Sequence, residues 1–230
     1  PQVDWRHVPI YDILLASPPC QGHSNASRGA RHSGHKEMRD AAWAVVRCAD
    51  VTSPRAIIVE NVPQFADWDR YFEWKGALAE LGYHLQDHYL VASRYGVPQR
   101  RARLFVTGFR TPEILSFAPQ EEIPFGSSIE WSEKGWRRIC EASAAARKRI
   151  AAGRRRFGDR FITQHVTGHK GIGLDEPIRT ITKQDQWAVV NGEFYRPLTY
   201  RENARAMGFP DSYKIPEHFR RTDVISGLGN

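Results

Sequence analysis

Short apolar runs alternating with segments of helical periodicity constrain the fold of this chain most. The apolar runs have the length and composition of buried strands, and the segments between them repeat apolar residues at helical spacing. We expect strands at 11–17, 56–59, 83–92 and 104–108, with helices at 38–52 and 69–81. Strands that alternate with helices predict an α/β fold built on a doubly wound, mostly parallel sheet.

This alternation stops near residue 110. Prolines, an Ala/Arg-rich helix predicted near 134–152 and a Gly/His-rich stretch at 165–173 follow. We therefore predict an α/β domain over 1–109 and a small second domain over 110–195. Residues 196–230 are predicted to return to the first domain.

The positive charge of the chain is concentrated in one segment. The formal net charge is +7, and residues 131–160 alone hold ten Lys and Arg residues against three acids. An excess of this size favours a polyanionic partner such as nucleic acid. The alternative for any one of these arginines is a solvated helix face.

The three cysteines, Cys20, Cys48 and Cys140, are odd in number and lack the spacing of metal ligands. This pattern argues against a disulfide framework or a metal site and indicates a reducing compartment, so we expect a cytoplasmic protein. No apolar run is long enough to predict a membrane span, and we expect no membrane partner.

Cys20 is the strongest candidate for a catalytic nucleophile in this sequence. It stands in the run Ser-Pro-Pro-Cys-Gln directly after the strand at 11–17, and Glu60 ends the next predicted strand. Residues just past the carboxyl ends of such strands lie where open α/β sheets bind ligands. A lone cysteine is otherwise most often a small buried hydrophobic residue.

Five ordered blocks resemble the motifs of the DNA cytosine-5 methyltransferase family. They are Pro19-Cys20-Gln21, Glu60-Asn61-Val62, the Gln99–Arg103 block, the late block from Leu198 to Tyr213, and Gly229-Asn230. Ser-Pro-Pro also occurs in amino-methyltransferases, but an aromatic residue stands there in place of Cys20. The resemblance implies S-adenosylmethionine as cofactor and methyl transfer to C5 of cytosine in duplex DNA.

The resemblance also implies a division of labour among catalytic residues. Cys20 would attack C6 of a flipped-out cytosine, and Glu60 would bind N3 and the exocyclic amine. Arg103 would bind O2 with support from Arg101, since alternate residues of one strand point the same way. Pro19 and Asn230 are the expected cofactor contacts.

Several polar and basic residues are predicted to bind the nucleic acid. The segment 22–37 is expected to clamp the DNA, and 110–195 is expected to recognise the target sequence. The predicted contacts are Gln21, Ser24, Asn25, Arg28, Arg31, Gln99, Arg154, Arg155 and Arg156. Arginines in such numbers suit phosphate binding.

Two alternatives and several expectations about assembly remain open. An RNA cytosine-5 methyltransferase would share these motifs, and an inactive DNA-binding fragment would lack only the chemistry. The glycine-rich cofactor turn of the family is absent from the chain, so weak binding of S-adenosylmethionine is expected without an upstream segment. We expect a monomer of bacterial or phage origin, with a cognate restriction nuclease as a candidate partner.

Overall fold

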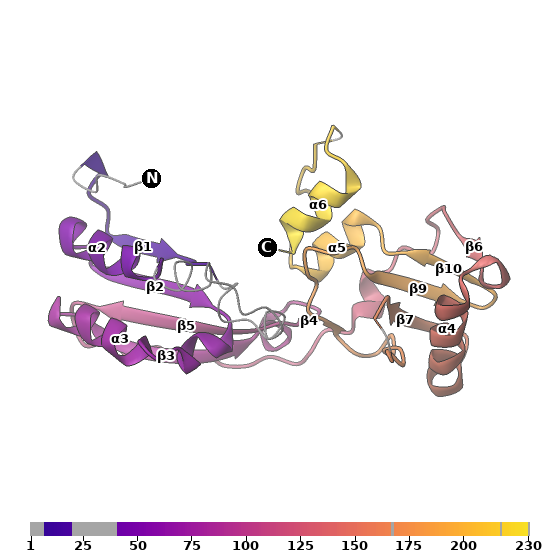
Figure 1. Ribbon diagram of the computed structural model, residues 1–230, viewed down its shortest axis with the longest axis horizontal. Helices are drawn as coiled ribbons and strands as arrows, with labels where there is room; N and C mark the ends of the chain where they lie inside the picture. The colour runs from indigo at the N-terminus through magenta and orange to yellow at the C-terminus, as the bar shows by residue number, and fades with distance from the viewer. Residues whose placement is uncertain (1–6, 20–40, 167, 217, 230) are drawn as a thin grey trace. The chain divides into compact units, whose positions relative to one another are not determined.

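The computed structural model describes residues 7–19, 41–166, 168–216 and 218–229. The chain divides into two compact units. The first unit comprises Pro1–Leu90 and Ala102–Ala118, and the second comprises Val91–Arg101 and Pro119–Asn230. Each unit has its own sheet (Figure 1). Each also has its own core of buried side chains.

The first unit is an α/β layer. Its elements are β1 (Ile13–Ala16), α2 (Trp43–Thr52), β2 (Ala56–Asn61), the 3-10 turn η3 (Pro63–Asp67), α3 (Tyr71–Glu80), β3 (His84–Val91) and β5 (Ala102–Phe109). The strand order is β1-β2-β5-β3, so β5 lies between β2 and β3 (Figure 1). β1 runs parallel to β2, whereas β5 runs antiparallel to it.

Both helices in the described part of the first unit contribute to one core. Val45 of α2 and Leu78 of α3 are buried in the same cluster as Ile57 and Val59 of β2. Trp74 is fully buried, and its indole N–H donates to the carbonyl of Ala42 at 3.0 Å. Since side chains alternate along a strand, the even-numbered residues of β2 face away from this core. Glu60 is therefore on the face of β2 that is opposite this core.

The second unit is organised around an antiparallel sheet. Its helices are α4 (Ala144–Phe157), α5 (Tyr200–Ala206) and α6 (Arg221–Leu228), and its strands are β4 (Gln99–Arg100), β6 (Arg137–Arg138), β7 (Arg160–Gln164), β8 (Ile178–Arg179), β9 (Trp187–Asn191) and β10 (Phe194–Pro197). It also contains the short 3-10 turns η4 (Ala92–Tyr95), η5 (Phe125–Ser128) and η6 (Ile139–Glu141). The main sheet has the order β6-β10-β9-β7, and β4 pairs with β8 in a separate parallel pair.

The main sheet of the second unit is covered on both faces. Phe161 and Val190 cluster with Ile150 of α4, while Ile162 and Val189 belong to a larger cluster. α4 lies close to β7 because its residue 153 is glycine. A Cβ atom built on Gly153 would come within 2.2 Å of the Phe161 ring. This close approach leaves no room for a larger side chain.

The α/β class predicted from the sequence is confirmed, and the described sheet of the first unit is mixed. The helix predicted at 134–152 begins instead at Ala144, because Ser143 caps it and accepts the backbone N–H of Ala146. Residues 196–230 pack within the second unit. None of the helices in the described ranges is both long and apolar enough to cross a bilayer.

Candidate active site

Glu60 and Arg103 form an ion pair at the end of β2. The Nε atom of Arg103 lies 2.7 Å from Oε1 of Glu60, and the two side chains are 17% and 32% exposed, respectively. Arg103 also donates to the carbonyl of its neighbour Ala102 at 2.7 Å. The pairing follows from the register, since Glu60 lies opposite Phe105 and Arg103 shares the face of Phe105 on β5. The two residues that the sequence assigns to the pyrimidine therefore lie together.

Asn61 connects this strand end to the segment that follows β1. Its side chain is buried, and Nδ2 donates to the carbonyl of Pro18 at 3.1 Å. Oδ1 accepts the backbone N–H of Val62 at 2.9 Å. The amide group therefore fixes both the exit of β2 and the backbone at Pro18. This double contact gives a physical reason for an asparagine directly after Glu60.

Pro19, the residue after Pro18, is exposed. The remaining predicted contacts of this region lie outside the described residues: Cys20, Gln21, Ser24, Asn25, Arg28, Arg31 and Asn230. The structure thus brings Glu60 and Arg103 together at the end of β2, and Asn61 links this strand end to the backbone at Pro18.

Arg101 does not share a strand with Arg103, so the prediction that the two side chains alternate along one strand is wrong. The backbone turns after β4, where the N–H of Arg101 bonds to the carbonyl of Gln99. The guanidinium of Arg101 donates to the carbonyl of Ile181 at 3.3 Å within the second unit. Its support of the catalytic site stays a prediction.

Gln99 is fully buried, which corrects the prediction that it binds nucleic acid. Its Nε2 donates to the carbonyl of Ala206 at 2.9 Å, and its Oε1 accepts the N–H of Ile181 at 2.9 Å. With both ends of the amide bonded inside the second unit, Gln99 has a structural role.

The three arginines at the end of α4 differ from one another. Arg154 forms ion pairs with Asp159 at 3.5 Å and Glu193 at 3.0 Å and donates to the carbonyl of Gly192. Its charge is therefore neutralised locally, against the prediction of a phosphate contact. Arg155 is exposed, and exposed Arg156 lies over the ring of Phe157. These two remain available to a polyanion.

The polar residues of the late block stabilise the second unit. Thr199 and Glu202 form a capping box at the start of α5. Arg205 binds both carboxylate oxygens of Asp211, at 2.7 and 2.9 Å. Glu202 is also enclosed in an ion pair with Arg196, which no motif in the sequence indicated.

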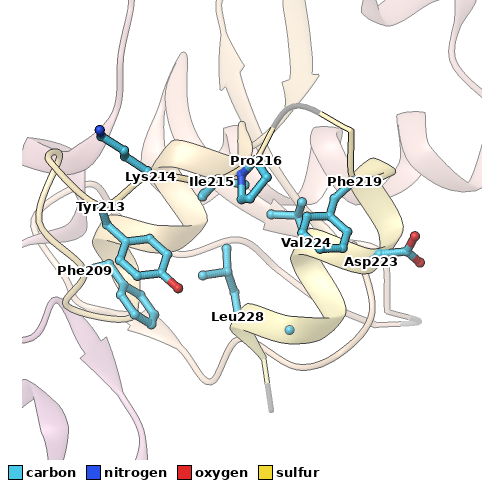
Figure 2. A pocket seen from close by; sticks show the side chains of 10 residues that line it. Phe209, Tyr213, Lys214, Ile215, Pro216, Phe219, Asp223, Val224 and Leu228 are labelled. Carbon is cyan, nitrogen blue, oxygen red and sulfur yellow. The ribbon is translucent and has the colours of Figure 1, made fainter.

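An apolar cavity of about 310 Å³ lies between the 209–219 segment and α6 (Figure 2). Its described lining is Phe209, Tyr213, Lys214, Ile215, Pro216, Phe219, Asp223, Val224, Gly227 and Leu228. The Lys214 amine and the Asp223 carboxylate point away from the rings of Phe209 and Tyr213 in Figure 2. The cavity therefore offers mainly apolar contact.

No group of three or more His, Cys, Asp or Glu side chains suited to a metal occurs within the described ranges.

Comparison with known proteins shows which family this chain is similar to. A family model for C-5 cytosine-specific DNA methylases matches residues 2–135. The type II methyltransferase M.NgoBI of Neisseria gonorrhoeae is 26% identical over 98% of this chain and 72% of its own length. M1.BsuMI of Bacillus subtilis, also a type II methyltransferase, is 38% identical over 95% of this chain, which spans 57% of that relative.

A solved structure supports the same fold. The methyltransferase EhMeth of Entamoeba histolytica superposes with a TM-score of 0.63 at 18% sequence identity. The superposition covers 95% of this chain and 72% of EhMeth. The similarity of the backbone therefore extends through both units.

Proposed function

Because the chain belongs to the C-5 cytosine-specific DNA methylase family, and is thus of the DNA cytosine-5 methyltransferase class, we propose that it methylates C5 of cytosine at specific sites in duplex DNA. The target base leaves the helix, since C5 and C6 are out of reach within a stacked duplex. The observation that carries the proposal is the Glu60–Arg103 pair at the end of β2. Asn61 links that strand end to Pro18, two residues before the proposed nucleophile.

The pair suits the polar edge of cytosine. Glu60 binds N3 and the exocyclic amine, while Arg103 donates to O2. Beyond their mutual contact and the Ala102 carbonyl, the two side chains have no further hydrogen bond to described residues. Both are partly exposed, so each retains capacity for a ligand.

The proposed chemistry begins at Cys20. Its thiolate forms a bond to C6, and the electron pair of the C5–C6 double bond makes C5 nucleophilic. Glu60 and Arg103 neutralise the negative charge that this addition places on the ring. After C5 is methylated, the C5 proton passes to solvent water, the electrons of the C5–H bond re-form the C5–C6 double bond, and the Cys20 thiolate leaves.

S-adenosylmethionine supplies the methyl group when it is bound. Exposed Pro19 fits the backbone contact expected of this cofactor, because it directly follows the turn that Asn61 holds. Asn230 is the second proposed contact.

A covalent trap tests this function. We expect the protein, incubated with S-adenosylmethionine and its target duplex containing 5-fluorocytosine, to form a complex that survives denaturation. Fluorine at C5 cannot leave as a proton does, so the Cys20–C6 bond persists. Cys20→Ala should abolish the complex, whereas Cys140→Ala should retain it, since Cys140 is a free, exposed cysteine. A complex that persists in Cys20→Ala would refute the proposed nucleophile.

The alternatives give different results. Transfer of labelled methyl groups to tRNA and not to duplex DNA would favour the RNA enzyme. Binding of DNA without methyl transfer would favour the inactive fragment. The proposal further includes a cytoplasmic monomer of a restriction-modification system, in keeping with the type II class of its relatives.

A further inference from the structure

A second cavity, separate from the candidate active site, lies beside α4 in the second unit. Its volume is about 370 Å³, and its described lining is Ala145, Lys148, Arg149, Ala152, Gly168, His169 and Lys170. The four α4 residues recur at helical spacing and share one face of the helix. The two alanines leave space between the longer basic side chains.

The basic side chains of this cavity have no carboxylate partner among the described residues. Lys148 and Lys170 are exposed, and Arg149 is partly buried, with its Nε atom enclosed and not hydrogen-bonded within the described ranges. Arg154, on the same helix, shows the opposite arrangement, because it pairs with acidic side chains. The cavity therefore keeps a positive charge that the fold leaves uncompensated.

His169 is a further polar residue in the lining of this cavity. The side chain is 8% exposed, and its Nδ1 accepts the backbone N–H groups of Gln164 and Gly171, both at 3.2 Å. Since Nδ1 is an acceptor, the ring proton must be on Nε2. That nitrogen is buried and bonded to no described group. The ring also packs edge-on against Trp187, with the ring centroids 5.8 Å apart. A buried N–H without a hydrogen-bond partner is unusual in a native fold, so Nε2 keeps the capacity to donate to an acceptor.

The surroundings keep His169 neutral. Burial lowers its pKa below the usual value, and the charges of Arg179 and Arg149 lower it further. His165 responds in the same direction, through burial and then Arg149, with Asp185 opposing. Burial is the larger cause of both lowered pKa values, and the positive charge of Arg149 adds to it in each case.

We propose that this cavity binds a phosphate group, with Arg149, Lys148 and Lys170 supplying charge and Nε2 of His169 donating a hydrogen bond. Phosphate matches three cations and an N–H donor, since its oxygens are all acceptors. If the chain acts on DNA as proposed above, the phosphate is that of the DNA backbone. The cavity then positions the second unit on the duplex without reading bases.

The ring resonances of His169 provide a direct test. We expect inorganic phosphate and duplex DNA each to shift them and to raise the pKa of His169, because a bound anion favours the imidazolium. Arg149→Gln should weaken both interactions about tenfold, the effect of removing one charge-assisted hydrogen bond. Lys148→Gln should act in the same direction, and it tests the cavity even if Arg149→Gln fails to fold.

Arg155→Gln is the matched control, because it removes the same charge from the same helix outside the cavity. It should leave the response of His169 to phosphate within about twofold of the original. Equal losses of phosphate binding in Arg149→Gln and Arg155→Gln would overturn the proposal, as would a His169 that does not respond to phosphate. A response to phosphate with none to DNA would overturn the DNA source.

The outcome is independent of catalysis. Methyl transfer with an unresponsive His169 leaves the proposed function standing and refutes the cavity. A responsive His169 without methyl transfer supports the cavity and refutes the proposed function.

Discussion

Two Arg–Glu pairs, one in each unit, have nearly the same contact distance and opposite surroundings. Arg103 and Glu60 meet at 2.7 Å with side chains 17% and 32% exposed. Arg196 and Glu202 meet at 2.8 Å with side chains 2% and 0% exposed. The open pair stays accessible to a ligand, whereas the enclosed pair is sealed into its unit.

Both oxygens of the enclosed carboxylate are occupied by hydrogen bonds within the unit. One oxygen of Glu202 accepts from Arg196 and the N–H of Glu130, and the other accepts from Arg196 and the N–H of Thr199. Arg196 additionally donates to the carbonyl of Glu130 and lies over the ring of Trp136. Distance alone therefore does not reveal the role of an ion pair. The unused hydrogen-bonding capacity and the exposure do.

Glu60→Gln should produce the largest change. Glutamine has nearly the same shape but cannot carry the proton to N3, so we expect single-turnover methyl transfer to fall by about 10²–10⁴-fold. Stability should change by about 1 kcal/mol or less, since partly exposed pairs contribute little. Labelled methyl transfer and urea unfolding measure the two effects. A large loss of stability with unchanged transfer would reverse the roles assigned to the pairs.

Glu202→Gln should have the opposite profile. The substitution leaves Arg196 buried without its counter-charge, and we expect the free energy of unfolding to fall by about 3–5 kcal/mol. Urea denaturation measures this, with Glu60→Gln as the control. Replacing both partners by apolar residues, Arg196→Met with Glu202→Leu, should recover much of the loss. If Glu202→Gln alone were as stable as the original protein, the enclosed pair would not be needed for stability.

The arginines at the end of α4 should show the smallest effects. Arg155→Gln with Arg156→Gln should lower the slope of log affinity against log salt by about two, if each contacts one phosphate. Arg154→Gln should leave the slope nearly unchanged, because its charge is already paired. Binding to duplex DNA across a salt series decides between them. Equal slope changes for all three would mean that the pairing of Arg154 does not matter.

Local pattern was sufficient for the elements that carry the candidate active site. The strand predicted at 56–59 is β2, the helix at 69–81 is α3, and Glu60 stands at the strand end as expected. These predictions succeed because apolar periodicity and strand length are properties of neighbouring residues. The predicted helix start at 134 was wrong for a local reason too. Ser143 caps the helix, but the Ala/Arg-rich composition of the segment hid this signal.

What the sequence alone determined is the class of fold, the positions of the motifs and the chemistry available in them. Tertiary structure alone decided which polar groups stay free. Gln99 and Arg154 resemble ligand contacts in the sequence, but distant partners, Ala206 and Glu193, occupy them. His169 and Arg149 are twenty residues apart and line a single cavity, which no sequence pattern predicted. The reason is physical, because burial and hydrogen-bond satisfaction depend on segments that meet only after the chain has packed.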